Sequence, residues 1–288
     1  MAHRTLPAAI ALLLWAVLAQ AAEPTTCLWR VEGPGGTLWL LGSIHLLAPE
    51  ASELPPAMER AVAGARRMVF EVDFDSAGDA GTAILRRASL PGEQRLSDLL
   101  DPRSAERLGE ALLAVGLQPA DLEGFKPWYV AITLAGMELR QAGYEPGLGI
   151  DLRLWNRARA AGIPTAGLET VAQQIAFLDG LGLPEQVELL RQTLDEMDRL
   201  VPQVEEITRL WRTGRAGELA ELLGSTFAET PGLYRRLVVE RNRAWLPEIE
   251  RLARTEHHTV VVVGVLHLVG DEGLVALLRR DGFSVTQE

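Results

Sequence analysis

The chain has 288 residues, of which 48% are hydrophobic, enough for one large domain or two small ones with a buried core. Its 39 acidic and 28 basic residues give a formal net charge of −11, and the basic residues form no run. We therefore expect no nucleic-acid partner and no anionic membrane surface as a partner, since either needs clustered positive charge. The single cysteine, Cys27, excludes an internal disulfide and fits a small packed side chain better than a catalytic thiol.

The first 21 residues have the features of a secretory signal peptide. A positive start at Arg4 precedes an apolar run over residues 8–18, and Ala19-Gln20-Ala21 supplies small residues for cleavage. The run is too short to cross a bilayer comfortably. We expect one mature domain over residues 22–288, periplasmic or secreted, with no stable membrane anchor after cleavage.

Strand and helix patterns alternate at both ends of the chain, with a mostly helical middle. Hydrophobic runs predict strands at residues 37–41, 68–74, 165–168, 259–263 and 283–286. Capping signals and helical periodicity predict helices at residues 55–66, 102–115, 127–141, 148–161, 171–178, 184–211, 233–254 and 271–282. The helix at 233–254 is expected to be kinked or split near Pro247. Together these elements predict an α/β fold with a mixed central sheet, flanking helices and a mostly helical insertion or cap over about residues 96–254.

Two of the predicted buried strands end in the same motif. When the segment that begins at Thr37 is aligned with the one that begins at Thr259, Gly42 matches Gly264 and His45 matches His267. With 27 Gly and 5 His in 288 residues, chance gives about 27 × 5/288, or 0.5, Gly-x-x-His occurrences. Imidazoles at strand ends lie where open α/β sheets place their sites. The alternative is a pair of core histidines satisfied by backbone groups.

Acidic residues accompany these strands. Glu71 and Asp73 alternate with apolar residues in the strand predicted at residues 68–74. Because side chains along a strand alternate between its two sides, Glu71 and Asp73 point to the same side. They either face solvent from an exposed sheet face or, in a central strand, need a partner such as a metal. Glu169 follows another strand and Asp151 stands in the first turn of a helix. Both positions also fit acids that favour a helix dipole.

Arg241 interrupts an apolar stripe formed by Leu233, Leu237, Trp245 and Ile249 at helical spacing. A charged residue at such a position can bury its stem and keep its head in water. Alternatively, the guanidinium is buried and paired with a carboxylate or a substrate oxyanion.

Taken together, these motifs resemble the TraB/PrgY/GumN family, which includes TIKI. The resemblance covers nearly the whole mature chain and implies an α/β fold with a metal site built from two Gly-x-x-His elements and an acid. TIKI members are regarded as metal-dependent proteases associated with Mn²⁺ or Co²⁺. The segments that carry the resemblance are Leu41-Gly42-Ser43-Ile44-His45, Phe70-Glu71-Val72-Asp73, Gly149-Ile150-Asp151, Gly167-Leu168-Glu169-Thr170, Glu240-Arg241-Asn242 and Gly264-Val265-Leu266-His267.

The resemblance implies that His45 and His267 are the paired histidines and that Glu71 is the metal-binding acid. Arg241 and Glu169 match the accompanying polar positions. We therefore hypothesise an exported metal-dependent hydrolase, a peptidase, in which Mn²⁺, Co²⁺ or Zn²⁺ lowers the pKa of a bound water.

In this hypothesis a second carboxylate, Asp73 or Glu169, acts as general base, and Arg241 stabilises the oxyanion. The substrate is a peptide or a small molecule. The alternatives are a periplasmic protein that binds or sequesters a peptide or other ligand without turnover, and an accessory protein for surface polysaccharide. The long helix at 184–211 either offers a partner surface or packs its apolar face on the core. The sequence does not set the oligomeric state.

Overall fold

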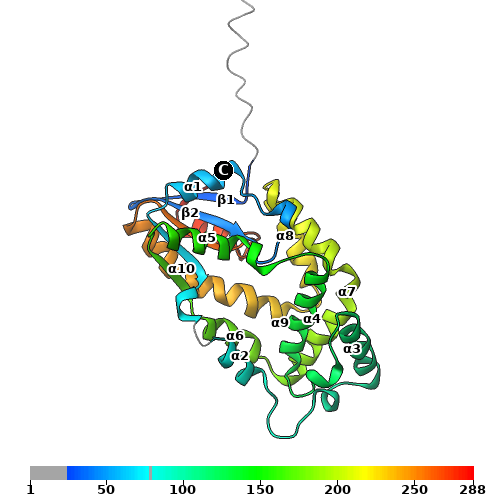
Figure 1. Cartoon of the computed structure of the whole chain (residues 1–288). Coiled ribbons are helices and arrows are strands. Elements are labelled where there is room, and N and C mark those ends of the chain that lie inside the picture. The colour runs from blue at the N-terminus through cyan, green and yellow to red at the C-terminus, as the bar shows by residue number, and fades with distance from the viewer. Residues whose placement is uncertain (1–24, 78–79) are drawn as a thin grey trace, which may run out of the picture.

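The computed structural model describes residues 25–77 and 80–288, so the predicted signal peptide at residues 1–21 lies outside the described residues. One sheet forms the centre of the fold, with its strands in the order β4-β3-β5-β2-β1-β6 (Figure 1). The strands are β1 (Leu28–Gly33), β2 (Gly36–Ser43), β3 (Arg67–Val72), β4 (Thr165–Glu169), β5 (Thr259–Gly264) and β6 (Ser284–Gln287).

The sheet is mixed, as predicted. β4, β3, β5 and β2 run parallel, whereas β1 runs antiparallel to both β2 and β6. The side chains from Val260 to Val263 in β5 are 0% exposed, which is typical of a strand covered on both faces. Because parallel strands end at the same edge of a sheet, the residues that follow β2, β3, β4 and β5 come together there.

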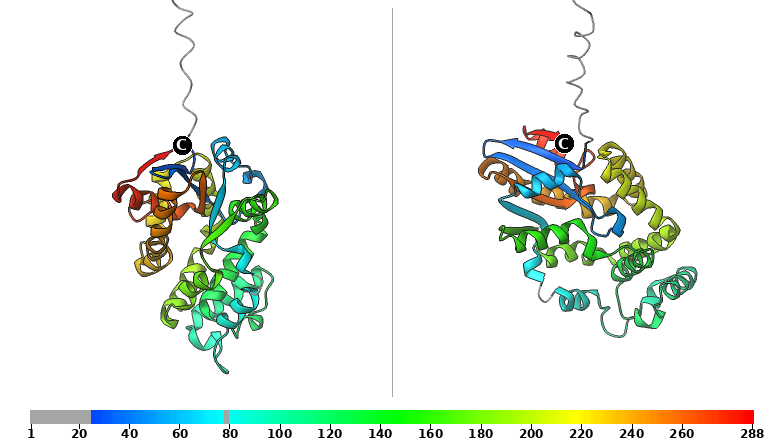
Figure 2. Two further views of the ribbon diagram at one scale, coloured as in Figure 1. Left: turned by 90° about the vertical axis from the view of Figure 1, so that its left-hand side faces the viewer. Right: turned by 45° about the horizontal axis from the view of Figure 1, so that its top comes forward.

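Helices cover both faces of this sheet. Figure 2 shows α10 and α11 on one side, with α1 and α5 on the other, and contacts join α10 to β1 and β2 and α5 to β3. The helices are α1 (Pro56–Ala63), α2 (Ala80–Ala88), α3 (Pro102–Ala114), α4 (Pro127–Gln141), α5 (Ile150–Ala160), α6 (Val171–Asp179), α7 (Leu183–Arg212), α8 (Ala216–Thr226), α9 (Pro231–Tyr234), α10 (Glu240–Thr255) and α11 (Leu274–Arg280).

A second hydrophobic core lies apart from the sheet. Its buried residues come mainly from α3, α4 and the first part of α7, and include Leu108, Leu112, Leu134 and Leu190. The interval 96–254 is thus mostly helical, but it also contributes β4, α5 and α10 to the layers around the sheet. Within residues 25–77 and 80–288, no helix combines the length and hydrophobicity that a membrane span needs.

The helix predicted at 233–254 is not split near Pro247, but it has a π-helical segment before Glu240. α10 continues through Pro247, so the predicted split there is wrong. Pro247 is exposed, and water can satisfy the carbonyl that its missing N–H leaves free. The irregular part is the π-helical segment Arg235–Val239, which joins α9 to α10 and ends directly before Glu240. Such segments are frequent at functional sites.

Candidate functional site

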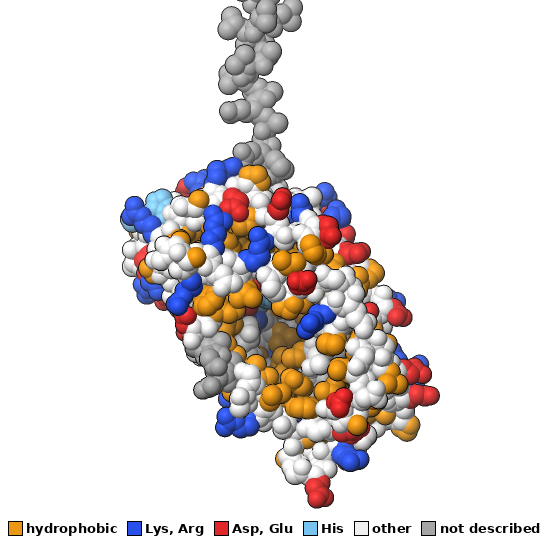
Figure 3. All heavy atoms as spheres, viewed as in Figure 1, with side chains coloured by type: hydrophobic (Ala, Val, Ile, Leu, Met, Phe, Trp, Pro, Cys, Tyr) orange, Lys and Arg blue, Asp and Glu red, His pale blue; other side chains and the backbone are white. Residues whose placement is uncertain are grey.

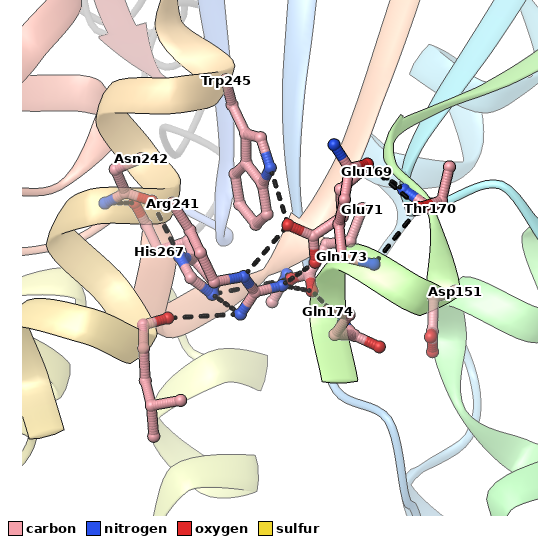
Figure 4. A network of polar contacts seen from close by, with 12 residues as sticks. Glu71, Asp151, Glu169, Thr170, Gln173, Gln174, Arg241, Asn242, Trp245 and His267 are labelled. Atoms are coloured by element: carbon pink, nitrogen blue, oxygen red, sulfur yellow. Dashed lines mark hydrogen bonds and ion pairs between the residues drawn. The ribbon is translucent and has the colours of Figure 1, made fainter. Parts of the chain in front are cut away.

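Side chains from five separate elements meet at the carboxyl edge of the parallel strands. His45 follows β2, Glu71 lies near the end of β3, and Glu169 ends β4. His267 lies in the 3₁₀ turn Val265–His267 after β5, and Arg241 reaches the group from the first turn of α10. Figure 4 shows Arg241 pointing from its helix toward Glu71 and Glu169.

Gly264 occupies the centre of this group. A Cβ atom on Gly264 would lie 3.0 Å from Glu71 Oε1 and 3.6 Å from both His267 Cδ2 and His45 Nε2. Two histidines that are far apart in the sequence therefore lie beside one acidic side chain. The Gly264 backbone has a φ of −51°, so glycine is favoured here by the space it leaves and not by its backbone freedom.

The Arg241 guanidinium is the hub of a buried network. Nη2 donates to Glu71 Oε2 and to Glu169 Oε1, each at 2.8 Å, and Nε donates to Glu169 Oε2 at 3.3 Å. Nη1 donates to the Leu237 carbonyl at 3.2 Å and lies 3.0 Å from His267 Nε2. Arg241 is 8% exposed. The prediction of a buried, paired guanidinium is therefore correct, and the alternative of a head group held in water is wrong.

These contacts use all five N–H groups that a guanidinium can donate. Arg241 would have to give up one of its existing acceptors before it could donate to a substrate oxyanion, the role expected from the sequence. In this arrangement the Arg241 guanidinium holds Glu71, Glu169 and His267 in place.

Asn242 fixes the tautomer of His267. The Asn242 amide nitrogen donates to the carbonyls of His267, at 3.1 Å, and Glu272, at 2.8 Å. Its oxygen therefore faces His267 Nδ1, at 2.7 Å. The network thus assigns the ring hydrogen to Nδ1 and leaves the Nε2 lone pair to accept from Arg241. Burial lowers the pKa of His267 to about 4, so this imidazole is neutral at pH 7.

His45 has a different environment, because 52% of its side-chain surface is accessible. Its Nδ1 lies 2.9 Å from Oδ2 of Asp151 in the first turn of α5. A Cβ on Gly149 would lie 2.2 Å from the His45 carbonyl oxygen, so glycine permits the close approach of the two segments. Partial loss of hydration lowers the pKa of His45, but the hydrogen bond and charge of Asp151 and the charge of Glu71 outweigh this effect and raise the pKa to about 9.

Glu71 is buried, and both of its oxygens accept hydrogen bonds. The Gly264 N–H donates to Oε1 at 2.5 Å, and Oε2 accepts from Arg241. Burial raises the pKa of this carboxyl, but His267, His45, Arg241 and the Gly264 N–H outweigh it and lower the pKa to about 2. Glu71 is therefore a carboxylate at neutral pH, and the alternative of a solvent-facing acid is wrong.

Glu169 and Trp245 complete the buried side of the site. Trp245 Nε1 donates to Glu169 Oε2 at 3.1 Å, and the Arg241 Cζ lies 4.6 Å from the centre of the Trp245 ring. The same ring lies 4.7 Å from that of His267. Burial raises the pKa of Glu169, and the bonds from Arg241 partly offset that rise.

Sequence reasoning missed the partners that hold the predicted residues. Asp151 was interpreted as a helix N-terminal acid, yet it contacts His45. Asn242 forms a hydrogen bond with His267, and Trp245 donates one to Glu169. Trp245 lies four residues after Arg241, on the same face of the helix, and this spacing was a usable signal for its contact with Glu169. Asp73 lies past the end of β3 and accepts a hydrogen bond from the Asp75 N–H at 3.0 Å.

A cavity of about 590 Å³ opens beside this network, within the size range of small-molecule sites. The titratable side chains that line it among the described residues are those of His45, Glu71 and Asp151. Arg241 and His267 stand behind Glu71 and do not belong to the lining. The cavity lining is His45, Leu46, Glu71, Val72, Phe74, Pro146, Asp151, Leu152, Val171 and Gln174.

The predicted divalent metal does not fit these side chains as they are arranged. His267 Nε2 faces the Arg241 guanidinium, and both Glu71 oxygens already accept N–H groups. A dication placed there would also lie against the positive charge of Arg241. In the part of the chain that the structure describes, no group of three or more His, Cys, Asp or Glu side chains is arranged to hold a metal ion.

Comparison with known protein families gives a match over nearly the whole chain. Residues 27–287 match the family model described as the TraB/PrgY/gumN family, which covers nearly all of the chain. No curated protein and no solved structure matches the sequence.

Proposed function

Because the chain belongs to the TraB/PrgY/gumN family, we propose that it is a hydrolase whose active site is the cavity beside His45 and Glu71. One observation carries this proposal. An imidazole and a carboxylate face the same cavity, and their surroundings move the pKa of His45 to about 9 and that of Glu71 to about 2. Paired groups with pKa values driven apart are typical of acid–base sites.

The arrangement supports acyl transfer to water. In its free-base form, His45 accepts a proton from water while the water oxygen bonds to the substrate carbonyl carbon. The carbon–nitrogen or carbon–oxygen bond of the substrate then breaks, and His45 returns the proton to the leaving atom. The Glu71 carboxylate stabilises the imidazolium by its charge. Asp151 orients His45, and Arg241 holds Glu71, so both are positioning residues.

A peptide bond is the first substrate we propose, with esters of carboxylic acids as the second. The divalent metal implied by the family resemblance stays a prediction, and no step above passes through it. Export also stays a proposal. It predicts that the protein purified from the cell envelope or medium begins near Ala22.

A peptide-library and ester-panel assay, read by mass spectrometry, tests the function. We expect cleavage by the parent protein, loss of cleavage in His45→Ala, and full retention in His257→Ala, which changes an exposed histidine of the loop before β5. Activity that survives dialysis against EDTA contradicts the metal prediction, whereas loss restored by Mn²⁺, Co²⁺ or Zn²⁺ supports it. Binding of peptides by the folded parent without any turnover would replace the hydrolase by the ligand-binding alternative.

A further inference from the structure

Most of the residues that line the cavity are apolar, and together they form a surface that we call the apolar wall. Figure 3 shows hydrophobic side chains gathered around a hollow in the middle of this face of the molecule. The apolar lining comes from the loop after β2, the end of β3 and its following turn, the 3₁₀ turn Pro146–Leu148, and the first turns of α5 and α6. These lining residues are Leu46, Val72, Phe74, Pro146, Leu152 and Val171.

Packing holds part of this wall in place. The Phe74 ring lies 5.5 Å from that of Trp155 in α5 and 6.0 Å from that of Phe70 in β3, measured between ring centres. Val72, the last residue of β3, is 8% exposed. Because β3, α5 and α6 carry Val72, Leu152 and Val171, this part of the wall is formed before a ligand arrives.

The charges that line the cavity oppose an acidic ligand group. Glu71 and Asp151 contribute two carboxylates, His45 contributes one imidazolium below its pKa of about 9, and none of the described lining residues is Lys or Arg, so the lining carries a net negative charge. An acidic side chain would lose its hydration against apolar groups while lying near like charge. An aliphatic or aromatic side chain would instead cover apolar surface.

We propose that this wall binds an uncharged aliphatic or aromatic side chain next to the bond that is cleaved. The inference rests on the proposed function, because it assigns the substrate class of the same site. Covering one large apolar side chain corresponds to about 10- to 100-fold in affinity. Substrates with Leu or Phe beside the cleaved bond should therefore be preferred over those with Asp by that factor.

Matched peptides that differ by Leu or Asp at one position test the proposal in two ways. Cleavage by the parent protein gives kcat/KM, and calorimetric binding to the His45→Ala variant gives Kd whether or not cleavage occurs. Val171→Arg, on the wall, should reduce the preference for Leu at least about tenfold by adding a cation and removing apolar surface. Leu113→Arg changes a 55% exposed leucine of α3 and should leave the preference unchanged.

The two readouts separate this inference from the proposed function. Tighter binding of the Leu peptide without cleavage of any peptide supports the apolar wall and contradicts the hydrolase. Equal binding and equal cleavage of Leu and Asp peptides overturn the apolar wall while the hydrolase stands. An unchanged preference in Val171→Arg also overturns it, provided that circular dichroism shows the variant folded.

Discussion

The two Gly-x-x-His segments share a sequence pattern but differ in the surroundings of their histidines. His45 has 52% of its side-chain surface accessible and faces the cavity, whereas His267 has 9% accessible and stands behind Glu71. His45 is paired with an acid, Asp151, and its pKa is raised to about 9. His267 is paired with a neutral amide, Asn242, and its pKa is lowered to about 4. One motif presents a histidine to the cavity, where the proposed function uses it to exchange protons, and the other supports the buried network.

The register of the sheet also separates the two glycines of these motifs. Gly42 pairs with Val263, and Ser43 pairs with Gly264, so the two motifs are offset by one residue. Because side chains alternate between sheet faces, this offset sends equivalent positions to opposite faces. A Cβ on Gly42 would lie 2.9 Å from Val265 Cγ2, in the core, whereas a Cβ on Gly264 would face the site. Matching residues in two strands therefore do not imply matching roles.

Replacing each histidine by alanine should show the difference between their roles most clearly. His45→Ala should lower kcat/KM by about 10²- to 10⁴-fold, the usual contribution of a general base, with little change in the free energy of unfolding. His267→Ala should lower the free energy of unfolding by about 1–3 kcal/mol, since Arg241 and Asn242 each lose a buried partner. Steady-state kinetics and urea denaturation measure both. Equal effects of the two variants on both quantities would contradict the division of roles.

Removal of the shared cation should have the next largest effect. Arg241→Ala leaves Glu71 and Glu169 buried without their counter-ion, and we expect a loss of about 3–5 kcal/mol in unfolding free energy. Arg243→Ala is the matched control on the same helix. Its ion pair with Glu272 involves a side chain that is 64% exposed, so about 0–1 kcal/mol is expected. Similar losses in both variants would show that the buried network contributes no more than a surface pair.

The two glycines offer a finer comparison. An added Cβ at Gly42 would press on Val265, so Gly42→Ala should lower the free energy of unfolding by about 1–3 kcal/mol, the usual cost of overpacking. At Gly264 the Cβ would lie 3.0 Å from the Glu71 carboxylate. Gly264→Ala should therefore lower kcat/KM by a larger free energy than it removes from the free energy of unfolding. Thermal unfolding and kinetics on the same preparations distinguish them. A stability loss confined to Gly264→Ala would reverse the expected assignment.

Much of the fold was predictable because it depends on local patterns. The apolar runs that end at Gly42 and Gly264 predicted two buried strands, which lie side by side in the sheet. Period-two alternation placed Glu71 within a third strand, although that strand ends at Val72 and not at Phe74. The stripe around Arg241 predicted its helix, although it left open whether the guanidinium is buried. The π-helical turn before Glu240 leaves no such pattern, and the expected irregularity at Pro247 followed proline chemistry alone.

The pairing within the site depends on tertiary geometry that the sequence does not encode locally. Asp151 and His45 are 106 residues apart, and their contact requires α5 to begin beside the loop after β2. The tautomer of His267 can be assigned only because the Asn242 amide nitrogen already donates to two carbonyls. For the same reason the sequence could group the residues by resemblance but could not tell which nitrogen of each histidine is open.

The smallest expected effect concerns pH and isolates the partner of His45. Since catalysis needs the free base, kcat/KM of the parent should rise with pH along a limb near the His45 pKa of about 9. Asp151→Asn removes the charge that raises this pKa, so the limb should move to lower pH. The stability that this pair contributes is fully present below the unfolded pKa of about 6.5 and is lost as pH rises through about 9. The variant should therefore lose stability at neutral pH but differ little from the parent above pH 9, where a pH series of urea denaturations detects the convergence. A limb that stays in place would mean that the titrating group is not His45.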